Sequence, residues 1–382
     1  MIGATKGSTR GSVRGAVAVD GGLPWDGFGG SGTAILLDYA ASTFARASEA
    51  ASYDLRTGLW GPAWLGTDVA PILPDGAIRI EGSRTNKVVN SQAGGALGAA
   101  TLTSNVADGP DGSSLTADRI TSTGTALDAR WRYHDKGAVI PASIFSCFVK
   151  AGTQGSYCDI DHGTTVNGDP RTPIPAAWSR LVKAVTSTSR YISVCLGYHD
   201  GTQTGASGDN LLCWGWETQE GTFTSSPIRT TGAEATRAVD ICSFAVGTAL
   251  DAGRWAVDVW PEMTHTILAA LAYDPTIYLR DATHHLAISR GAGTPKVQLT
   301  VGGVVVALSS ALTWSAHQQL TVTIDWNART MTVAGATTGN GTTAITGVGT
   351  WADATGTVLR VGSSDAAGAT PLFGCLSRPV AV

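Results

Sequence analysis

Short apolar runs separated by turn-forming residues are the feature that most constrains the fold of this chain. From residue 92 to 382, runs of β-branched, aromatic and other apolar residues are bounded by clusters of Gly, Asp, Asn and Pro. Several runs alternate apolar and polar residues with a period of two, the repeat of a half-buried strand. The clearest candidates are residues 142–152, 179–185, 190–198, 209–219, 253–260, 276–281, 284–290, 296–308, 318–326, 329–335, 357–363 and 372–382.

This spacing of short strands and turns predicts an all-β fold of tandem antiparallel β-sandwiches of the jelly-roll type. Gly302 and Gly303 separate two apolar runs and predict a tight hairpin, because such turns need residues that tolerate a positive φ. An α/β fold would need helical patterns that the sequence does not supply. The range 38–55 holds at most one short helical turn, and residues 76–90 read as a strand followed by polar turn residues.

Composition divides the 382 residues into four parts. Residues 1–35 are rich in glycine and form an expected extended anchor, and residues 36–91 form a connector. Residues 92–240 and 241–382 are the two expected sandwiches, each long enough to bury a core.

Charge argues against two classes of partner. Lysine and arginine number 26 and aspartate and glutamate number 30, which gives a net charge of −4. A chain with no strong positive field is not drawn to nucleic acid or to an anionic membrane surface. The chain also lacks an apolar run of about 18 residues and the charged-then-apolar order of a signal peptide. We therefore expect neither nucleic-acid binding nor membrane insertion.

Two groups of residues have the chemistry of metal ligands. Asp159, Asp161 and His162 lie between a strand candidate and a turn, where acidic residues are common turn formers. His284 and His285 are adjacent in a strand candidate, so their side chains point to opposite faces and cannot share an ion without distortion. We predict no metal site and no cofactor, with an ion at the first group as the alternative.

The cysteines are spaced singly, without the close pairs that metal or redox sites use. Most stand in apolar strand candidates, where cysteine behaves as a small hydrophobic residue. We predict buried reduced thiols rather than disulfides at Cys147, Cys158, Cys195, Cys213, Cys242 and Cys375.

Aromatic side chains are the most promising signal for a ligand, because sugar rings stack on Trp and Tyr while polar neighbours bind the hydroxyls. Trp131 and Tyr133 alternate with Arg132 and His134, so one strand face would carry the rings and the other the polar groups. These four residues are the candidate ligand-binding site. The alternative is that both rings belong to the core, which we expect for Trp214 and Trp216.

Ordered motifs run through residues 43–240. Residues 43–61 contain Phe-Ala-Arg-Ala-Ser and then a Gly-Leu turn, and residues 78–91 contain Ile-Glu-Gly-Ser-Arg-Thr-Asn and an Asn-Ser end. Further motifs occupy residues 110–120, 145–152, 176–185 and 213–240. In this order and spacing they resemble the modular structural proteins of tailed bacteriophages, which carry lectin-like β-sandwiches in tail fibres, head fibres and other virion appendages. The ranges 321–333 and 359–382 resemble the last strands of laminin-G or concanavalin-like sandwiches.

The resemblance implies a carbohydrate-binding-like jelly roll over 92–240 and a laminin-G or concanavalin-like sandwich over 241–382. It implies a non-enzymatic virion protein of a tail fibre, head fibre or spike. Such a protein is held by residues 1–35 to other virion proteins, exposed on the particle and homotrimeric, and it displays its sandwiches toward host-surface glycans. The alternatives are a capsid or tail decoration or joining protein that binds no glycan, and a polysaccharide depolymerase.

The resemblance also bears on the acidic residues that a hydrolase would use. Glu217 and Glu220 fall in the closing strand of the first sandwich, whose polar residues hold the segment that follows. Glu81 and Arg84 are expected to form a structural ion pair or a turn anchor. No nucleophile elbow, phosphate loop or dinucleotide fingerprint occurs in a strand-to-helix setting. We therefore predict that the chain is not an enzyme.

Overall fold

The structure is a computed structural model of the chain. It describes residue 37 and residues 39–89, 95–97, 100–123, 131–135, 143–152, 157–162, 172–185, 191–196, 207–245, 250–271, 273–290, 294–347, 349–356, 358–363 and 371–382. These residues belong to one compact unit, Thr33–Val382. The expected anchor, residues 1–35, lies outside the described residues.

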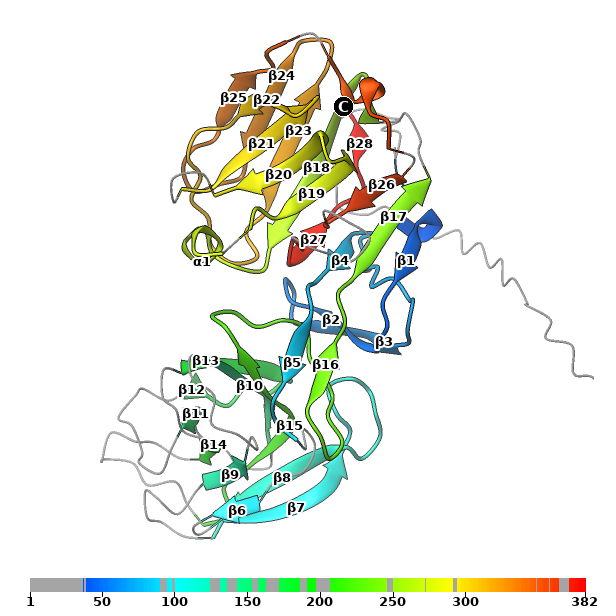
Figure 1. Cartoon of the computed structure of the whole chain (residues 1–382). Helices are drawn as coiled ribbons and strands as arrows, with labels where there is room; N and C mark the ends of the chain where they lie inside the picture. Colours follow the sequence, from blue (N-terminus) through cyan, green and yellow to red (C-terminus); the bar gives the residue numbers. More distant parts are fainter. Residues whose placement is uncertain are drawn as a thin grey trace, which may run out of the picture. The chain divides into compact units, whose positions relative to one another are not determined.

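The C-terminal part of the chain forms an antiparallel β-sandwich (Figure 1). One sheet contains, in spatial order, β1 (Thr43–Ala45), β17 (Ile241–Ala245), β26 (Val358–Val361), β19 (Thr276–Asp281), β20 (His284–Ser289), β21 (Lys296–Val301) and β22 (Val304–Leu308). The other contains β25 (Gly341–Ala344), β24 (Thr330–Ala334), β23 (Leu320–Asp325), β18 (Arg254–Pro261), β27 (Gly374–Leu376) and β4 (Ile78–Ile80), with β28 (Val380–Ala381) paired to β18.

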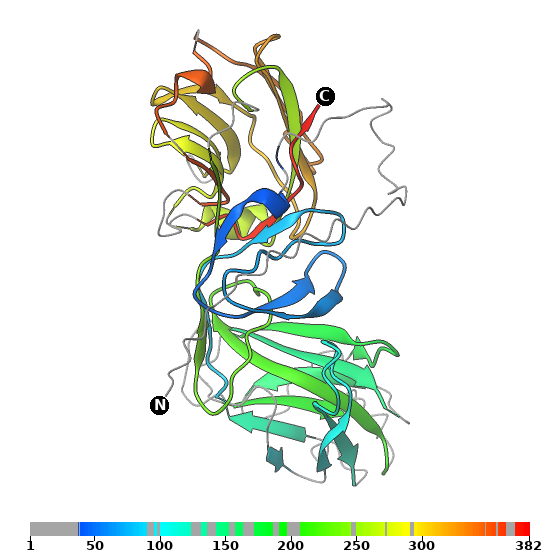
Figure 2. The same ribbon diagram turned by 90° about the vertical axis from the view of Figure 1, so that its right-hand side faces the viewer.

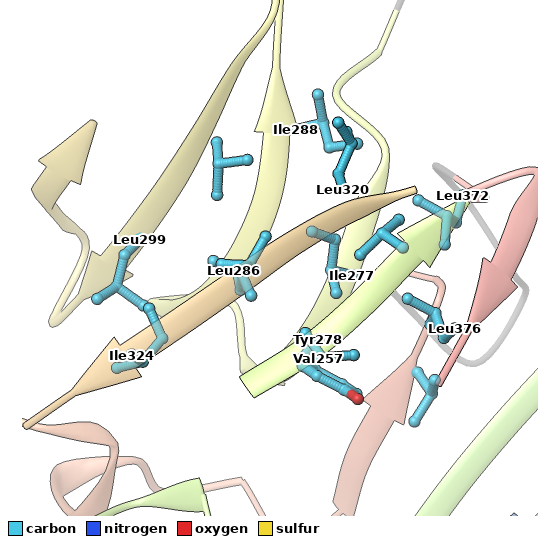
Figure 3. Close-up of a cluster of buried hydrophobic side chains, with 14 of the residues drawn as sticks. Val257, Ile277, Tyr278, Leu286, Ile288, Leu299, Leu320, Ile324, Leu372 and Leu376 are labelled. Carbon is cyan, nitrogen blue, oxygen red and sulfur yellow. The ribbon is translucent and has the colours of Figure 1, made fainter. Parts of the chain in front are cut away.

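Alternation along the strands builds the core of this sandwich. In β23, Leu320, Val322 and Ile324 are buried while the residues between them are partly exposed. Leu286 and Ile288 of β20 lie in the same buried cluster, so both sheets direct apolar side chains inward (Figure 3). This pattern is what the period-two repeat predicts.

Strands from the range 36–91 complete both sheets of the C-terminal sandwich. β1 pairs with β17, with Phe44 opposite Cys242, and β4 pairs with β27, with Ile80 opposite Gly374. A short 3-10 turn, η1 (Tyr39–Ala41), precedes β1. This turn and β4 agree with the short helical turn and the strand that the sequence predicts. Residues expected to be a turn instead form β5 (Arg84–Asn86), which pairs with β16 (Ala235–Arg237).

The first sandwich is also antiparallel. One sheet contains β13 (Ser179–Val185), β10 (Ser143–Ala151), β15 (Asn210–Glu220), β8 (Ala117–Ser122) and β7 (Ala100–Ala107) in spatial order. The other contains β12 (Thr172–Pro173), β11 (Tyr157–His162), β14 (Tyr191–Leu196), β9 (Trp131–Asp135) and β6 (Gly95–Leu97). The described chain is therefore all-β, as the sequence predicts.

Strand β10 is buried on both faces. Phe145, Cys147 and Val149 lie in the core of the first sandwich. Phe148 points to the opposite face and packs with Tyr53 in a separate cluster that includes residues of the hairpin β2 (Ala50–Asp54) and β3 (Leu59–Leu65). A strand covered on two sides reads as a nearly continuous apolar run, which explains the unbroken pattern of this segment.

Helical structure is scarce in the described residues. The short helix α1 (His265–Ala269) is capped by the Thr264 side chain, and η4 (Trp351–Asp353) follows a capping box from Thr350. Figure 2 shows the same strands turned by 90°. Within these residues, no helix has the length and apolar character needed to cross a membrane.

Candidate functional site

The predicted aromatic residues lie on the interior strand β9. Tyr133 is opposite Ser193 of β14 on one side and Gly95 of β6 on the other. This places the backbone of Trp131, Arg132, Tyr133 and His134 in the second sheet of the first sandwich. Their side chains lie outside the described part of the structure, so this site stays a prediction.

The polar residues of the closing strand β15 hold the segment that follows it. Glu217 Oε1 accepts hydrogen bonds from Ile228 N (3.1 Å) and from Gln219 Nε2 (2.7 Å), and its other oxygen pairs with Arg180. Gln219 Oε1 in turn accepts from Ser225 N at 3.0 Å. The structural role predicted for Glu217 is therefore confirmed.

Glu81 forms a structural ion cluster, but not with the predicted partner. Its carboxylate pairs with Arg79 Nε at 2.9 Å and with Arg237, and it accepts two hydrogen bonds from Ser226 at 2.6 Å. Burial alone raises the pKa of Glu81, but the charges of Arg237 and Arg79 outweigh it and hold the pKa below its usual value.

Arg84, the partner that the sequence suggests for Glu81, makes other contacts. Its guanidinium lies 4.1 Å from the Phe223 ring centroid and 5.1 Å from that of Phe373, and it donates to Glu220 O at 2.6 Å. Two buried arginines closer to Glu81 take the ion pair, so Arg84 is free to stack on the rings. The predicted Glu81–Arg84 pair is wrong in its partner.

The motifs that carry the sequence resemblance meet in space. Arg46 of the first motif pairs with Asp240 at the end of the last one (3.1 Å), and both side chains are buried. Asp240 also accepts from Glu81 N at 3.0 Å. Asn86 donates to Trp216 O and Ile228 O at 3.1 and 2.8 Å. These polar motif residues join three distant segments of the chain.

His284 and His285 do not form a shared site. Gly302 N donates to His284 Nε2 (3.2 Å), which leaves the ring proton on Nδ1, 2.8 Å from Asp281 Oδ1. His284 is buried, while His285 is half-buried. Among the described residues, no group of three acidic, histidine or cysteine side chains is arranged to hold a metal. Asp159, Asp161 and His162 are in β11, and their side chains lie outside the described part.

Four of the predicted thiols are free and buried, which confirms that prediction for the described cysteines: Cys147, Cys213, Cys242 and Cys375. Burial raises the pKa of Cys242 to about 12, which keeps this thiol protonated and unreactive. The side chains of Cys158 and Cys195 lie outside the described part. Trp214 and Trp216 are buried, as expected for core residues.

A surface groove lies over the β2–β3 hairpin and the loop before β4. Its volume is about 390 Å³, within the range of about 300–1,000 Å³ typical of small-molecule sites. The hairpin turns at Gly58, whose φ of +71° favours glycine. The groove is lined by Ser52, Asp54, Arg56, Thr57, Leu59, Trp60, Gly61, Ile72, Leu73, Pro74 and Asp75.

Trp60 contributes the aromatic part of this lining. Its ring packs against Tyr53 (5.3 Å between centroids), Phe148 (5.5 Å) and Trp214 (5.3 Å). These contacts fix the orientation of the indole. Its Nε1 is buried and has no hydrogen-bond partner among the described residues.

Arg56 fixes the charged part of the lining. Its Nε and Nη2 each lie 3.0 Å from an oxygen of Asp54, and its Nη1 lies 3.0 Å from Asp75 Oδ2. The guanidinium also lies 4.6 Å from the Trp260 ring centroid. Burial raises the pKa of Asp54, but hydrogen bonds from Arg56 outweigh it and lower the pKa, so the carboxylate stays charged. One arginine faces two carboxylates, which leaves a net charge of −1.

Apolar side chains complete the groove. Leu59 is 67% exposed and Ile72 is 40% exposed, although both are large hydrophobic residues. The sequence analysis does not single out this groove, because its two walls come from segments with no shared motif. The local signal was the Asp-Leu-Arg-Thr-Gly-Leu-Trp turn, which puts charged and aromatic residues on one hairpin.

Neither protein-family models nor curated proteins give a match to this chain.

Proposed function

We propose that the chain is a non-enzymatic structural protein of a tailed-phage particle. In this proposal it belongs to a tail fibre, head fibre or spike, is held to other virion proteins by residues 1–35, and displays its β-sandwiches for adhesion to host-surface glycans. The ordered motifs over residues 43–240 support the virion assignment. The all-β architecture with two sandwiches fits a display module.

One observation supports the non-enzymatic part most directly. The carboxylate of Glu81 is enclosed by two arginines and Ser226, and that of Glu217 by Arg180, Gln219 and a backbone amide. A general acid or base must reach a substrate proton, and these buried groups are committed to contacts within the protein. Binding without turnover is therefore the better proposal.

A glycan array probed with the full chain tests adhesion. Saturable binding to a host polysaccharide supports the proposal, and no binding to any glycan of the host surface contradicts it. The full chain is needed because strands β1 and β4 come from residues before 92. Incubation with the same polysaccharide tests the depolymerase alternative, since shortened chains would reveal hydrolysis.

Particle assembly tests the attachment. Deletion of residues 1–35 should abolish incorporation into particles while the remaining chain stays folded. Normal incorporation of the truncated chain would contradict the anchor.

A specific surface favours the second candidate, a decoration or joining protein. β22 is the outer strand of its sheet, and Val304 and Val305 are 64% and 45% exposed. An apolar edge strand suits contact with another protein chain. We also expect a homotrimer, which light scattering would show as three times 39.2 kDa. If this edge supplies the contact, Val305→Lys should give monomers, and a monomeric wild-type chain at micromolar concentration would contradict the trimer.

A further inference from the structure

We infer that the groove over the β2–β3 hairpin binds a neutral saccharide, of the N-acetylhexosamine kind. This inference rests on the proposed adhesive function and names a site for it that is separate from strand β9. It follows from the shape of the groove and from the chemistry of the side chains that line it.

The groove offers both surfaces that a sugar ring needs. The ring C–H groups are apolar and pack on an indole, while the hydroxyl groups need hydrogen bonds. Trp60 lines the groove and is held in place by Tyr53, Phe148 and Trp214. Because the indole is fixed before the ligand arrives, little conformational entropy is lost on binding.

The charged side chains provide fixed hydrogen-bond acceptors. Arg56 holds the carboxylates of Asp54 and Asp75 in place with three contacts of 3.0 Å. A carboxylate has about four acceptor positions, so each can still accept a hydroxyl proton. The hydroxyl groups of Ser52 and Thr57 line the same groove and can donate or accept.

The net charge of the groove selects against anionic ligands. Two carboxylates and one guanidinium leave one unit of negative charge, so phosphates and uronic acids are repelled. Sugars without charge carry many hydroxyl donors, which match the carboxylate acceptors. A neutral saccharide is therefore the chemistry that the polar groups fit.

The apolar wall adds a preference among neutral sugars. Leu59, Ile72, Leu73 and Pro74 line the groove. An acetamido methyl group placed against this wall would leave water, whereas a plain hexose has no such group. Burial of one methyl-sized group corresponds to about a fourfold gain in affinity, so N-acetylglucosamine should bind about fourfold more tightly than glucose.

The closing experiment titrates the full chain with N-acetylglucosamine, glucose and glucuronic acid, followed by saturation-transfer NMR. We expect saturable binding in the order just given, with none for glucuronic acid. Ile72→Trp should fill the groove and abolish binding. Val69→Trp adds the same ring at a position 44% exposed and outside the lining, so it should leave binding unchanged. Leu59→Ala, at a more exposed position, should weaken binding severalfold without affecting folding.

The outcomes separate this inference from the proposed function. Binding of host glycans that persists in Ile72→Trp overturns the groove site and leaves adhesion in place. Binding of N-acetylglucosamine in the groove without any host-glycan binding supports the site and overturns adhesion. Absence of all sugar binding overturns both, and stronger binding of glucuronic acid overturns the proposed selectivity.

Discussion

Two buried glutamates show at the residue scale how differently burial acts on the same side chain. Glu81 has two arginines and Ser226 in direct contact. Glu262 is 3% exposed, and neither of its carboxylate oxygens has a hydrogen-bond partner among the described residues. Burial, and then the charge of Glu81, raise the pKa of Glu262 well above its usual value. One carboxylate therefore stabilises the fold as an anion, and the other destabilises it when ionised.

Glu81→Gln should destabilise the protein. The substitution leaves Arg79 and Arg237 buried without their counter-ion, which costs roughly 3–5 kcal/mol. Because the pKa of Glu81 is lowered in the folded state, its contribution is present above the unfolded value of 4.5 and is lost as pH falls below it. Urea unfolding followed by tryptophan fluorescence should show a large loss at pH 7 that shrinks toward pH 3. A loss independent of pH would contradict the ionic explanation.

Glu262→Gln should have the opposite effect. Because the folded-state pKa is raised, wild-type stability falls as pH rises above 4.5, by about 1.4 kcal/mol per pH unit until the folded pKa is reached. The amide removes this dependence, so the variant should be more stable at pH 7 and similar at pH 4. Glu234→Gln is the control, since Glu234 makes a surface pair with Lys87 and should change stability little. A destabilised Glu262→Gln would contradict the unpaired state of this carboxyl.

At the element scale, the hairpin between β21 and β22 was predictable because its signal is local. Val301 pairs with Val304, and Gly302 and Gly303 have φ values of +58° and +78°. The strand runs were predictable for the same reason. The partner of Glu81 was not, because Arg237 lies far along the chain and nothing in the local pattern distinguishes it from Arg84. The groove likewise depends on two segments brought together only by folding.

Gly302→Val should weaken this hairpin. A Cβ atom added at Gly302 would meet no atom within 4 Å, so the cost comes from the backbone alone. A left-handed conformation costs an ordinary L-residue about 1–2 kcal/mol, and more for a β-branched one. Gly302→Asn should cost less, because Asn tolerates this conformation. Thermal melts of the two variants measure the difference, and equal melting temperatures would contradict the assignment of strain to the backbone.

At the scale of the whole molecule, the C-terminal sandwich is not continuous in sequence. β1 and β4 form outer strands of its two sheets, although they precede the first sandwich along the chain. Each is only three residues long, too short for a periodic pattern to reveal, and its partners lie far away in the sequence. The local pattern therefore identified the sandwich but not all of its strands.

A fragment of residues 241–382 should consequently fail to fold cooperatively. It loses the buried side chains of Tyr39, Phe44, Ile78 and Ile80 from the core cluster. Each large buried apolar side chain contributes about 1.5–3 kcal/mol, and a whole domain is stable by only about 5–15 kcal/mol. The fragment also exposes the edges of β17 and β27, which favours aggregation. Calorimetry should show one sharp transition for residues 33–382 and a broad or missing one for 241–382. A sharp transition of the fragment at the same temperature would show that β1 and β4 contribute little, because a sandwich that needs its outer strands cannot keep its stability without them.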